Sequence, residues 1–370
     1  SQYQVGLGLA SWEIDFWGRV RSLNDAALQN YLASDAARRA VTLGLIAQVA
    51  QSELALRELE ERLLLAHQAI ASRKESLRIF QRRVDVGSAS RLNLTQVQTL
   101  LSQAEALGAQ LEQARAQQAN ALALLVGAPV GPTPATVRLD TLQMPPLRVG
   151  LPSDLLAQRP DIMAAEHQLR AAQAQIGAAR AAFFPRVALT GSLGTASAEL
   201  GGLFDSGSQA WTFSPTISVP LFNGGRLRNN LNLTEVRRDI AVANYEKTVQ
   251  GAFRDVSDAL VARQVLARQL AIAQDARAAQ SERARLSQLR YDHGAAAFLE
   301  VLDAQRDLLV ADQQVVQLRR ALLSSQVSLY AALGGGALAE PPPMPPMPLA
   351  PPLPPPQPAP LPEPAPFQAP

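Results

Sequence analysis

The sequence predicts a mainly α-helical chain in which long antiparallel helical hairpins are joined to a few membrane-type β-strands. Helix patterns over 20–82 and 225–290 run without a proline, far beyond the average globular helix of about 11–12 residues. A shorter helix pattern follows each of them, over 90–126 and 297–333. We therefore expect two helical hairpins, 20–126 and 225–333, and strand patterns before each hairpin add the β component.

The chain contains two copies of one unit, offset by 207 residues. Residues 83–127 align with 290–334 without a gap, with 13 identities over 45 positions. The same offset places Gly18-Arg19-Val20-Arg21 on Gly225-Arg226-Leu227-Arg228, where a strand pattern becomes a helix pattern. A repeat this long indicates a duplicated domain half and not a solenoid.

The second copy is preceded by two elements that the first copy lacks in this sequence. These are a helix pattern at 153–182 and a strand pattern at 184–196. By symmetry we expect about 70–90 further residues before Ser1 in the native protein, with one helix and one strand.

The strand patterns alternate strictly between apolar and polar residues. Over 211–221 one face is apolar and the other carries Thr212, Ser214, Thr216 and Ser218. Such alternation over about 10 residues is typical of a strand that crosses a bilayer, although a half-buried strand of a soluble sheet gives the same pattern. Residues 3–17 alternate with a phase shift, which predicts a bulge. Since membrane strands cannot leave open edges, several chains would have to build one barrel from these strands and those within 184–222.

Connecting segments complete the expected organisation. Gly87 and Gly294 lie at the hairpin turns, where a left-handed residue is favoured. The proline- and glycine-rich stretch 127–152 cannot continue a helix, so we expect an equatorial connector, with helices 90–126 and 153–182 stacked end to end beside a long helix. Residues 340–370 include 17 prolines, which predicts a disordered tail over 337–370.

A seven-residue apolar spacing in the last helix predicts coiled-coil packing; its positions are Val301, Leu308, Val315, Leu322 and Leu329.

The composition argues against several classes of function. The chain has no cysteine, which excludes disulfides and thiolate metal sites. The net charge is +2, with basic residues interspersed among acidic ones, so nucleic acid is a poor partner. His67, His167 and His293 lie far apart without metal-ligand spacing. We therefore expect no catalytic residues, no metal and no cofactor, and a protein that is not an enzyme.

Several motifs together carry a family resemblance over residues 1–336. They are Ser11-Trp12-Glu13-Ile14-Asp15-Phe16-Trp17-Gly18, Leu151-Pro152-Ser153-Asp154-Leu155-Leu156, Arg159-Pro160-Asp161-Ile162, Phe183-Phe184-Pro185, Pro220-Leu221-Phe222-Asn223-Gly224-Gly225, Tyr245-Glu246-Lys247 and Leu302-Asp303-Ala304-Gln305-Arg306. In these runs the chain resembles the TolC family of outer-membrane efflux channels, and in particular its OprM-like, NodT-like lipoprotein branch.

This resemblance implies a homotrimer whose strands complete one transmembrane β-barrel and whose hairpins form a coiled-coil α-barrel in the periplasm. It implies passive export across the outer membrane of a Gram-negative bacterium, as the exit channel of a tripartite, RND-type drug efflux system. The implied partners are a periplasmic adaptor, an inner-membrane transporter and outer-membrane lipid. It also implies lipid anchoring through a cysteine outside this stretch.

The resemblance further implies a gate at the narrow periplasmic end. Leu299, Asp303 and Arg306 are spaced to share one helix face, and Tyr291 precedes the second turn. There Leu299 would form an apolar ring, Asp303 a carboxylate ring, and Arg306 and Tyr291 the links that hold the end shut. The residues expected to contact the adaptor are in the two turns, namely Val86, Gly87, Ser88, His293, Gly294 and Ala295.

A second hypothesis belongs to a different class of function. Long helical hairpins also suit a coiled-coil periplasmic adaptor or scaffold without a pore. The strands distinguish the two, because an adaptor has no use for an outward stripe of Trp, Phe and Leu, and this stripe favours the channel.

Overall fold

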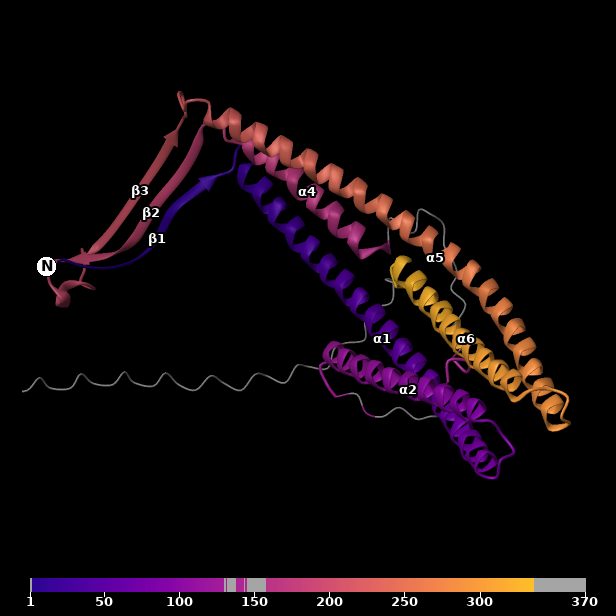
Figure 1. Cartoon of the computed structure of the whole chain (residues 1–370). Helices are drawn as coiled ribbons and strands as arrows, with labels where there is room; N and C mark the ends of the chain where they lie inside the picture. Colours follow the sequence, from indigo (N-terminus) through magenta and orange to yellow (C-terminus); the bar gives the residue numbers. More distant parts are fainter. Residues whose placement is uncertain (1, 130, 132–137, 143, 145–157, 336–370) are drawn as a thin grey trace, which may run out of the picture. The chain divides into compact units, whose positions relative to one another are not determined.

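The computed structural model describes residues 2–129, 131, 138–142, 144 and 158–335 (Figure 1). These belong to one compact unit, Ser1–Ala337. The predicted tail and most of the predicted connector lie outside the described residues. The elements are β1 Tyr3–Ile14, α1 Arg19–Asp85, α2 Arg91–Val126, α4 Pro160–Ala181, β2 Arg186–Ser197, the short 3₁₀ helix η1 Leu200–Gly202, β3 Gln209–Ser218, α5 Arg226–Asp292 and α6 Phe298–Ala332.

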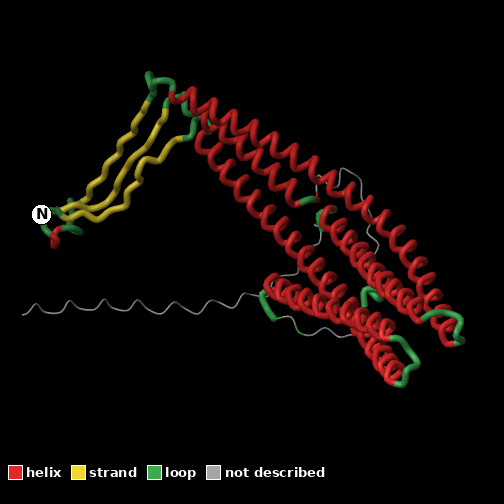
Figure 2. Tube along the Cα trace, viewed as in Figure 1, coloured by secondary structure: helices red, strands yellow, loops and turns green. Residues whose placement is uncertain are grey.

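The three strands form one antiparallel sheet in the order β1-β2-β3 (Figure 2). Leu7 lies opposite Leu193, which in turn lies opposite Trp211, and all three side chains are exposed. The other face is polar, and there Ser192 and Thr212 share a hydrogen bond of 2.8 Å. The alternation predicted from the sequence is thus present, with one apolar and one polar face.

The predicted bulge in β1 is confirmed, whereas the predicted end of this strand is wrong. The register shifts between Leu9 and Trp12, and Ser11 between them has a positive φ of 53°. The strand ends at Ile14 and not at residue 17, because Asp15 caps the next helix. Its carboxylate accepts the backbone N–H groups of Val20 and Arg21 at 3.0 and 2.9 Å, a typical use of aspartate at a helix start.

Charged and aromatic contacts join the sheet to the helices. Arg19 of α1 donates to both carboxylate oxygens of Glu13 at 2.7 and 2.5 Å, and Arg186 of β2 approaches the same carboxylate at 2.7 Å. Next to them Trp17 stacks on Phe184 with ring centroids 4.6 Å apart. One carboxylate therefore binds the ends of β1, β2 and α1 together.

The two long helices match in length. α1 and α5 each contain 67 residues, which at about 1.5 Å per residue is a span of about 100 Å. Each begins after a left-handed glycine, Gly18 at φ 73° and Gly225 at φ 80°. α2 lies against the end of α1 that is distal to the sheet, and α6 lies likewise against α5 (Figure 1).

The predicted heptad seam of α6 faces the core. Val301 and Leu329 are fully buried and Val315 is 3% exposed, while Leu308 and Leu322 are half-buried. Leu139, from the described part of the connector, is only 2% exposed and packs in one cluster with Leu54 of α1 and with apolar residues of α6. The connector thus contributes a side chain to the interface of α1 with α6.

Two predictions about the helix expected over 153–182 need correction, namely where it starts and which helix is stacked end to end with it. Residues 153–157 lie outside the described residues, and α4 begins only at Pro160 because the residue before a proline avoids helical dihedrals; Arg159 has ψ 121°. The helix that meets α4 end to end is α6, not the 90–126 helix (Figure 1). Arg159 at the start of α4 donates a hydrogen bond to the Ala332 carbonyl at the end of α6.

Candidate functional site at the hairpin tips

Both hairpin turns have the same backbone geometry. Gly87 and Gly294 adopt left-handed φ values of 76° and 71°. In the first turn the N–H of Ser88 donates to the Arg83 carbonyl at 2.7 Å, and in the second the N–H of Ala295 donates to the Arg290 carbonyl at 2.8 Å. This pairing closes the last turn of a helix that ends in a left-handed glycine. The residues expected to contact a partner lie in these two turns, and Val86 is 78% exposed.

The two tips of one chain pack against each other through an apolar cluster. Phe80 of α1, Val97 of α2 and Leu302 of α6 are each no more than 3% exposed. The ring of Phe298 bridges the hairpins, because its centroid lies 4.3 Å from that of Phe80 and 4.9 Å from that of Tyr291. The tips of the two hairpins are therefore held as one body.

Tyr291 makes a polar contact across the same boundary. Its hydroxyl accepts a hydrogen bond from Nη1 of Arg83. The Arg83 guanidinium also lies 5.7 Å from the Tyr291 ring centroid and 5.6 Å from that of Phe80, within the range of a cation–π attraction. Tyr291 is thus linked to α1 within its own chain.

Asp303 and Arg306 form the ion pair that their spacing suggested. Nη1 of Arg306 lies 3.1 Å from the Asp303 carboxylate, with side chains 49% and 38% exposed. Asp307 joins the pair, since it lies 3.2 Å from Arg306 and 2.8 Å from Arg283 of α5. The hydrogen bond from Arg283 outweighs desolvation and, together with Arg306, lowers the pKa of Asp307. One turn before Asp303, Leu299 is 45% exposed.

The predicted site residues therefore fall into two groups. Leu299, Asp303 and Arg306 lie on successive turns of α6, whereas Tyr291 belongs to the cluster between the hairpins. Sequence reasoning missed Phe80, Arg83 and Phe298. One signal was present in the repeat: Tyr291 replaces the Val84 of the first copy, and such a departure can mark a contact that only one copy makes.

The three histidines make local contacts. His67 lies 3.3 Å from Glu112, His167 lies 2.7 Å from Gln29, and His293 contacts the Leu289 carbonyl of its own helix. In the part of the chain that the structure describes, no three His, Asp or Glu side chains are grouped as metal ligands would be. No described helix has the length and apolar character needed to span a membrane.

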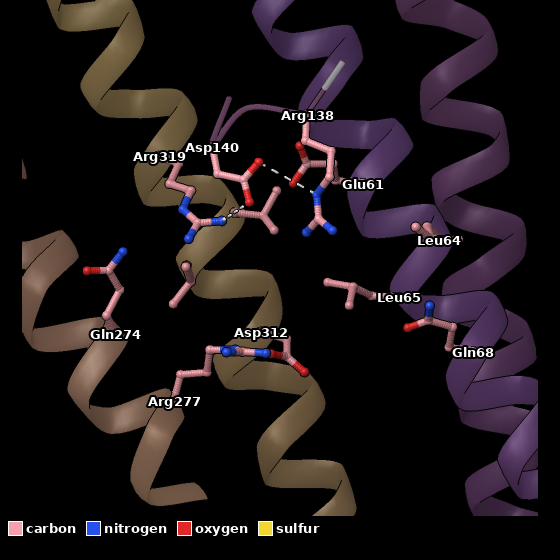
Figure 3. A pocket seen from close by; sticks show the side chains of 12 residues that line it. Glu61, Leu64, Leu65, Gln68, Arg138, Asp140, Gln274, Arg277, Asp312 and Arg319 are labelled. Carbon is pink, nitrogen blue, oxygen red and sulfur yellow. Dashed lines mark hydrogen bonds and ion pairs between the residues drawn. The ribbon is translucent and has the colours of Figure 1, made fainter. Parts of the chain in front are cut away.

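A polar cavity of about 510 Å³ lies at mid-length, between α1, α5, α6 and the segment 138–140 (Figure 3). Its arginine and aspartate side chains are paired with one another. Arg277 lies 2.5 Å from Asp312 and Arg319 lies 3.6 Å from Asp140, while Glu61 accepts the backbone N–H of Leu139. These contacts attach the described connector residues to α1 and α6.

Known proteins share both the sequence and this architecture. The chain matches the family "Outer membrane efflux protein" over residues 1–128 and 151–335. It is 45% identical over 338 residues to the solvent efflux pump outer membrane protein SrpC of Pseudomonas putida, covering 91% of this chain and 72% of that protein. The outer membrane protein OprJ of Pseudomonas aeruginosa is 44% identical over 340 residues, with coverages of 91% and 71%.

A solved structure of a similar protein has the same fold. The open state of the Neisseria gonorrhoeae MtrE outer membrane channel superposes with a TM-score of 0.83 at 41% identity, covering 91% of this chain and 76% of that one. These similarities exclude the alternative of a pore-less periplasmic adaptor. The chain belongs to the outer membrane efflux protein family and is an outer-membrane channel of an efflux system.

Proposed function

We propose that three copies of this chain form a single passive exit duct that is shut at the hairpin tips and opens when a periplasmic adaptor contacts the turns. The adaptor connects the duct to an inner-membrane transporter of the RND type, which supplies the energy. The duct itself carries out no chemistry. Relatives named for solvent efflux support small apolar molecules, drugs included, as the exported class.

The sheet supports assembly from several copies. Its order β1-β2-β3 leaves the outer edges of β1 and β3 without a strand partner among the described residues. Backbone groups in a bilayer must be hydrogen-bonded, so membrane strands close into barrels. Several copies around one axis can satisfy these edges by pairing the strands of neighbouring copies.

The Asp303–Arg306 pair is the observation that carries the proposed gate. Around a threefold axis three Asp303 carboxylates would repel one another, and each is stabilised by its own Arg306 at 3.1 Å. A partly exposed pair of this kind contributes only about 0.2–1 kcal/mol, which suits a latch that must open on contact. The ring of Leu299 side chains adds an apolar constriction, and such constrictions restrict water and ions.

Conductance of the assembled channel in a planar bilayer tests this gate. We expect the double variant Asp303→Ala/Arg306→Ala to raise the conductance of the closed channel and to weaken its cation selectivity, with assembly unchanged. The matched control is Asp35→Ala/Arg38→Ala on α1. That pair has the same i,i+3 spacing, the same 3.1 Å separation and a similar exposure, but it lies far from the tips.

The control should leave conductance and selectivity at the wild-type values. If the tip variant also behaved like wild type, Asp303 and Arg306 would be an ordinary solvated pair. Size-exclusion chromatography with light scattering of both variants checks that three copies still assemble.

A further inference from the structure

Arg73 of α1 is a buried cation that makes a single polar contact with the residues that the structure describes. The residue is 5% exposed, and its Nη1 donates to the Leu100 carbonyl of α2 at 2.8 Å. Within residues 2–129, 131, 138–142, 144 and 158–335, no carboxylate lies within 4 Å of its guanidinium. The contrast with its neighbours is clear, because Lys74 pairs with Glu105 at 3.2 Å and Arg78 pairs with Glu75.

A buried guanidinium remains positively charged. Arginine stays protonated at any physiological pH, and burying an unpaired charge is costly enough that proteins supply a counter-charge. A second positive charge nearby increases the need for a counter-charge at Arg73. Burial lowers the pKa of the Arg73 guanidinium, and the nearby positive charge of Arg306 lowers it further.

Arg73 lines a cavity that could hold a counter-ion. The cavity lies between α1 and α6 and measures about 220 Å³, against about 30 Å³ for one water in the liquid. Hydrogen-bond donors line it beside Arg73, namely Gln68, Ser72 and Gln305. The one carboxylate in its lining is Asp312, which is neutralised by Arg277 at 2.5 Å (Figure 3).

We propose that this cavity is a binding site for a small inorganic anion, such as chloride, held by the Arg73 guanidinium and the neighbouring amide and hydroxyl donors. The anion would supply the charge that no described side chain provides. It would also bridge α1 and α6, because Arg73 and Ser72 come from the first helix and Gln305 from the second. The site does not depend on the proposed gate, since none of its donors belongs to the Asp303–Arg306 pair.

Bromide tests the site directly, because it replaces chloride and scatters anomalously. Crystals of the assembled channel soaked in sodium bromide should show an anomalous peak within hydrogen-bond distance of the Arg73 guanidinium. The peak should be lost in Arg73→Met and retained in Arg78→Met, which removes an exposed arginine one turn away. Absence of a wild-type peak at Arg73, or peaks of equal height at many exposed arginines, would mean an adventitious ion only and overturn the proposal.

Thermal unfolding gives an independent measurement in solution. A ligand that binds only the folded state raises its melting temperature as its concentration rises. Replacing gluconate by chloride at constant ionic strength should raise the Tm of wild type and of Arg78→Met, but not that of Arg73→Met. If Arg73→Met does not fold, Arg73→Gln provides the same comparison. Equal chloride responses with and without the Arg73 charge would refute the site, whatever the gate variants do.

Discussion

Arg159 and Ala332 are 173 positions apart in the sequence, yet Nη1 of Arg159 donates to the Ala332 carbonyl oxygen at 3.1 Å. Carbonyls in the last turn of a helix lack partners within the helix, so this contact caps the end of α6 from the start of α4. The same guanidinium lies 2.6 Å from Asp161 and 3.5 Å from Asp255 of α5. One side chain therefore joins three helices.

Arg159→Gln should destabilise this junction. The change removes the cap and leaves the Asp161 carboxylate without its partner, whereas Asp255 keeps Arg254. We expect a loss of about 1–3 kcal/mol, in line with loss of hydrogen bonds to a charged group. The midpoint of thermal unfolding, followed by circular dichroism, measures it. Arg254→Gln is the control, because Arg254 also pairs with Asp255 at 2.8 Å but is 72% exposed, and its midpoint should stay near that of wild type. Equal midpoints for both variants would contradict a special role of Arg159.

Acid should weaken the same junction. Burial raises the pKa of the Asp161 carboxyl, but the hydrogen bond and charge of Arg159 outweigh it, so the pKa lies below its ordinary value. A lowered folded-state pKa means that the stabilisation is fully present above the unfolded value of about 3.9 and is lost as the pH falls through the folded value. Unfolding midpoints between pH 7 and pH 3 should therefore fall less steeply in Asp161→Asn than in wild type. Parallel curves would show that Asp161 does not contribute.

Gly194→Ala should disrupt the pairing of β1 with β2. A Cβ at this position would lie 2.2 Å from the Val5 carbonyl oxygen and 2.5 Å from Cα of Gly6, and backbone atoms in a sheet cannot move aside singly. Gly8→Ala is the matched control in the same sheet, because a Cβ there would lie 3.9 Å from the Gly191 carbonyl oxygen, an ordinary van der Waals contact. Gel electrophoresis of heated samples measures the amount of heat-resistant folded protein. We expect this amount to fall for Gly194→Ala and to stay at the wild-type level for Gly8→Ala. Normal folding of Gly194→Ala would mean that the strands are farther apart than described.

Tyr291→Phe isolates the hydroxyl that Arg83 contacts. The ring packing on Phe298 stays, while one hydrogen bond is lost, a change of about 0.5–1.5 kcal/mol. If this bond helps to hold the tips shut, the open fraction of the channel should rise about two- to tenfold in bilayer recordings. Tyr245→Phe on the same helix is the control, because the Tyr245 hydroxyl has no hydrogen bond within the described residues. No difference between the two variants would remove Tyr291 from the proposed gate.

Local patterns were enough to predict much of the fold. The left-handed turns at Gly87 and Gly294 follow from the conformational freedom of glycine, and the buried Val301 and Leu329 follow from the spacing of the heptad. Both are properties of a few neighbouring residues, which a sequence displays directly. The strand faces followed in the same way from their period of two.

Contacts between distant segments were not predictable in this way. Nothing near Arg159 indicates that its partner is Ala332, and for that reason helix 90–126 was assigned the stacking position that α6 occupies. Arg73 likewise reads as one more exposed arginine of a long helix, and only the packing of α2 and α6 shows it to be buried. The packing of Phe80 on Phe298 depends on where two separate hairpins end.

The equal length of α1 and α5 constrains how this protein can change in evolution. Each helix has 67 residues, and the aromatic cluster forms because both hairpins reach the same level. Deleting one heptad from α1 alone would withdraw its tip by about 10 Å, and Phe80 would no longer meet Phe298. Insertions and deletions in the two halves should therefore be inherited as matched pairs, so relatives with longer or shorter ducts should differ by the same number of residues in both copies.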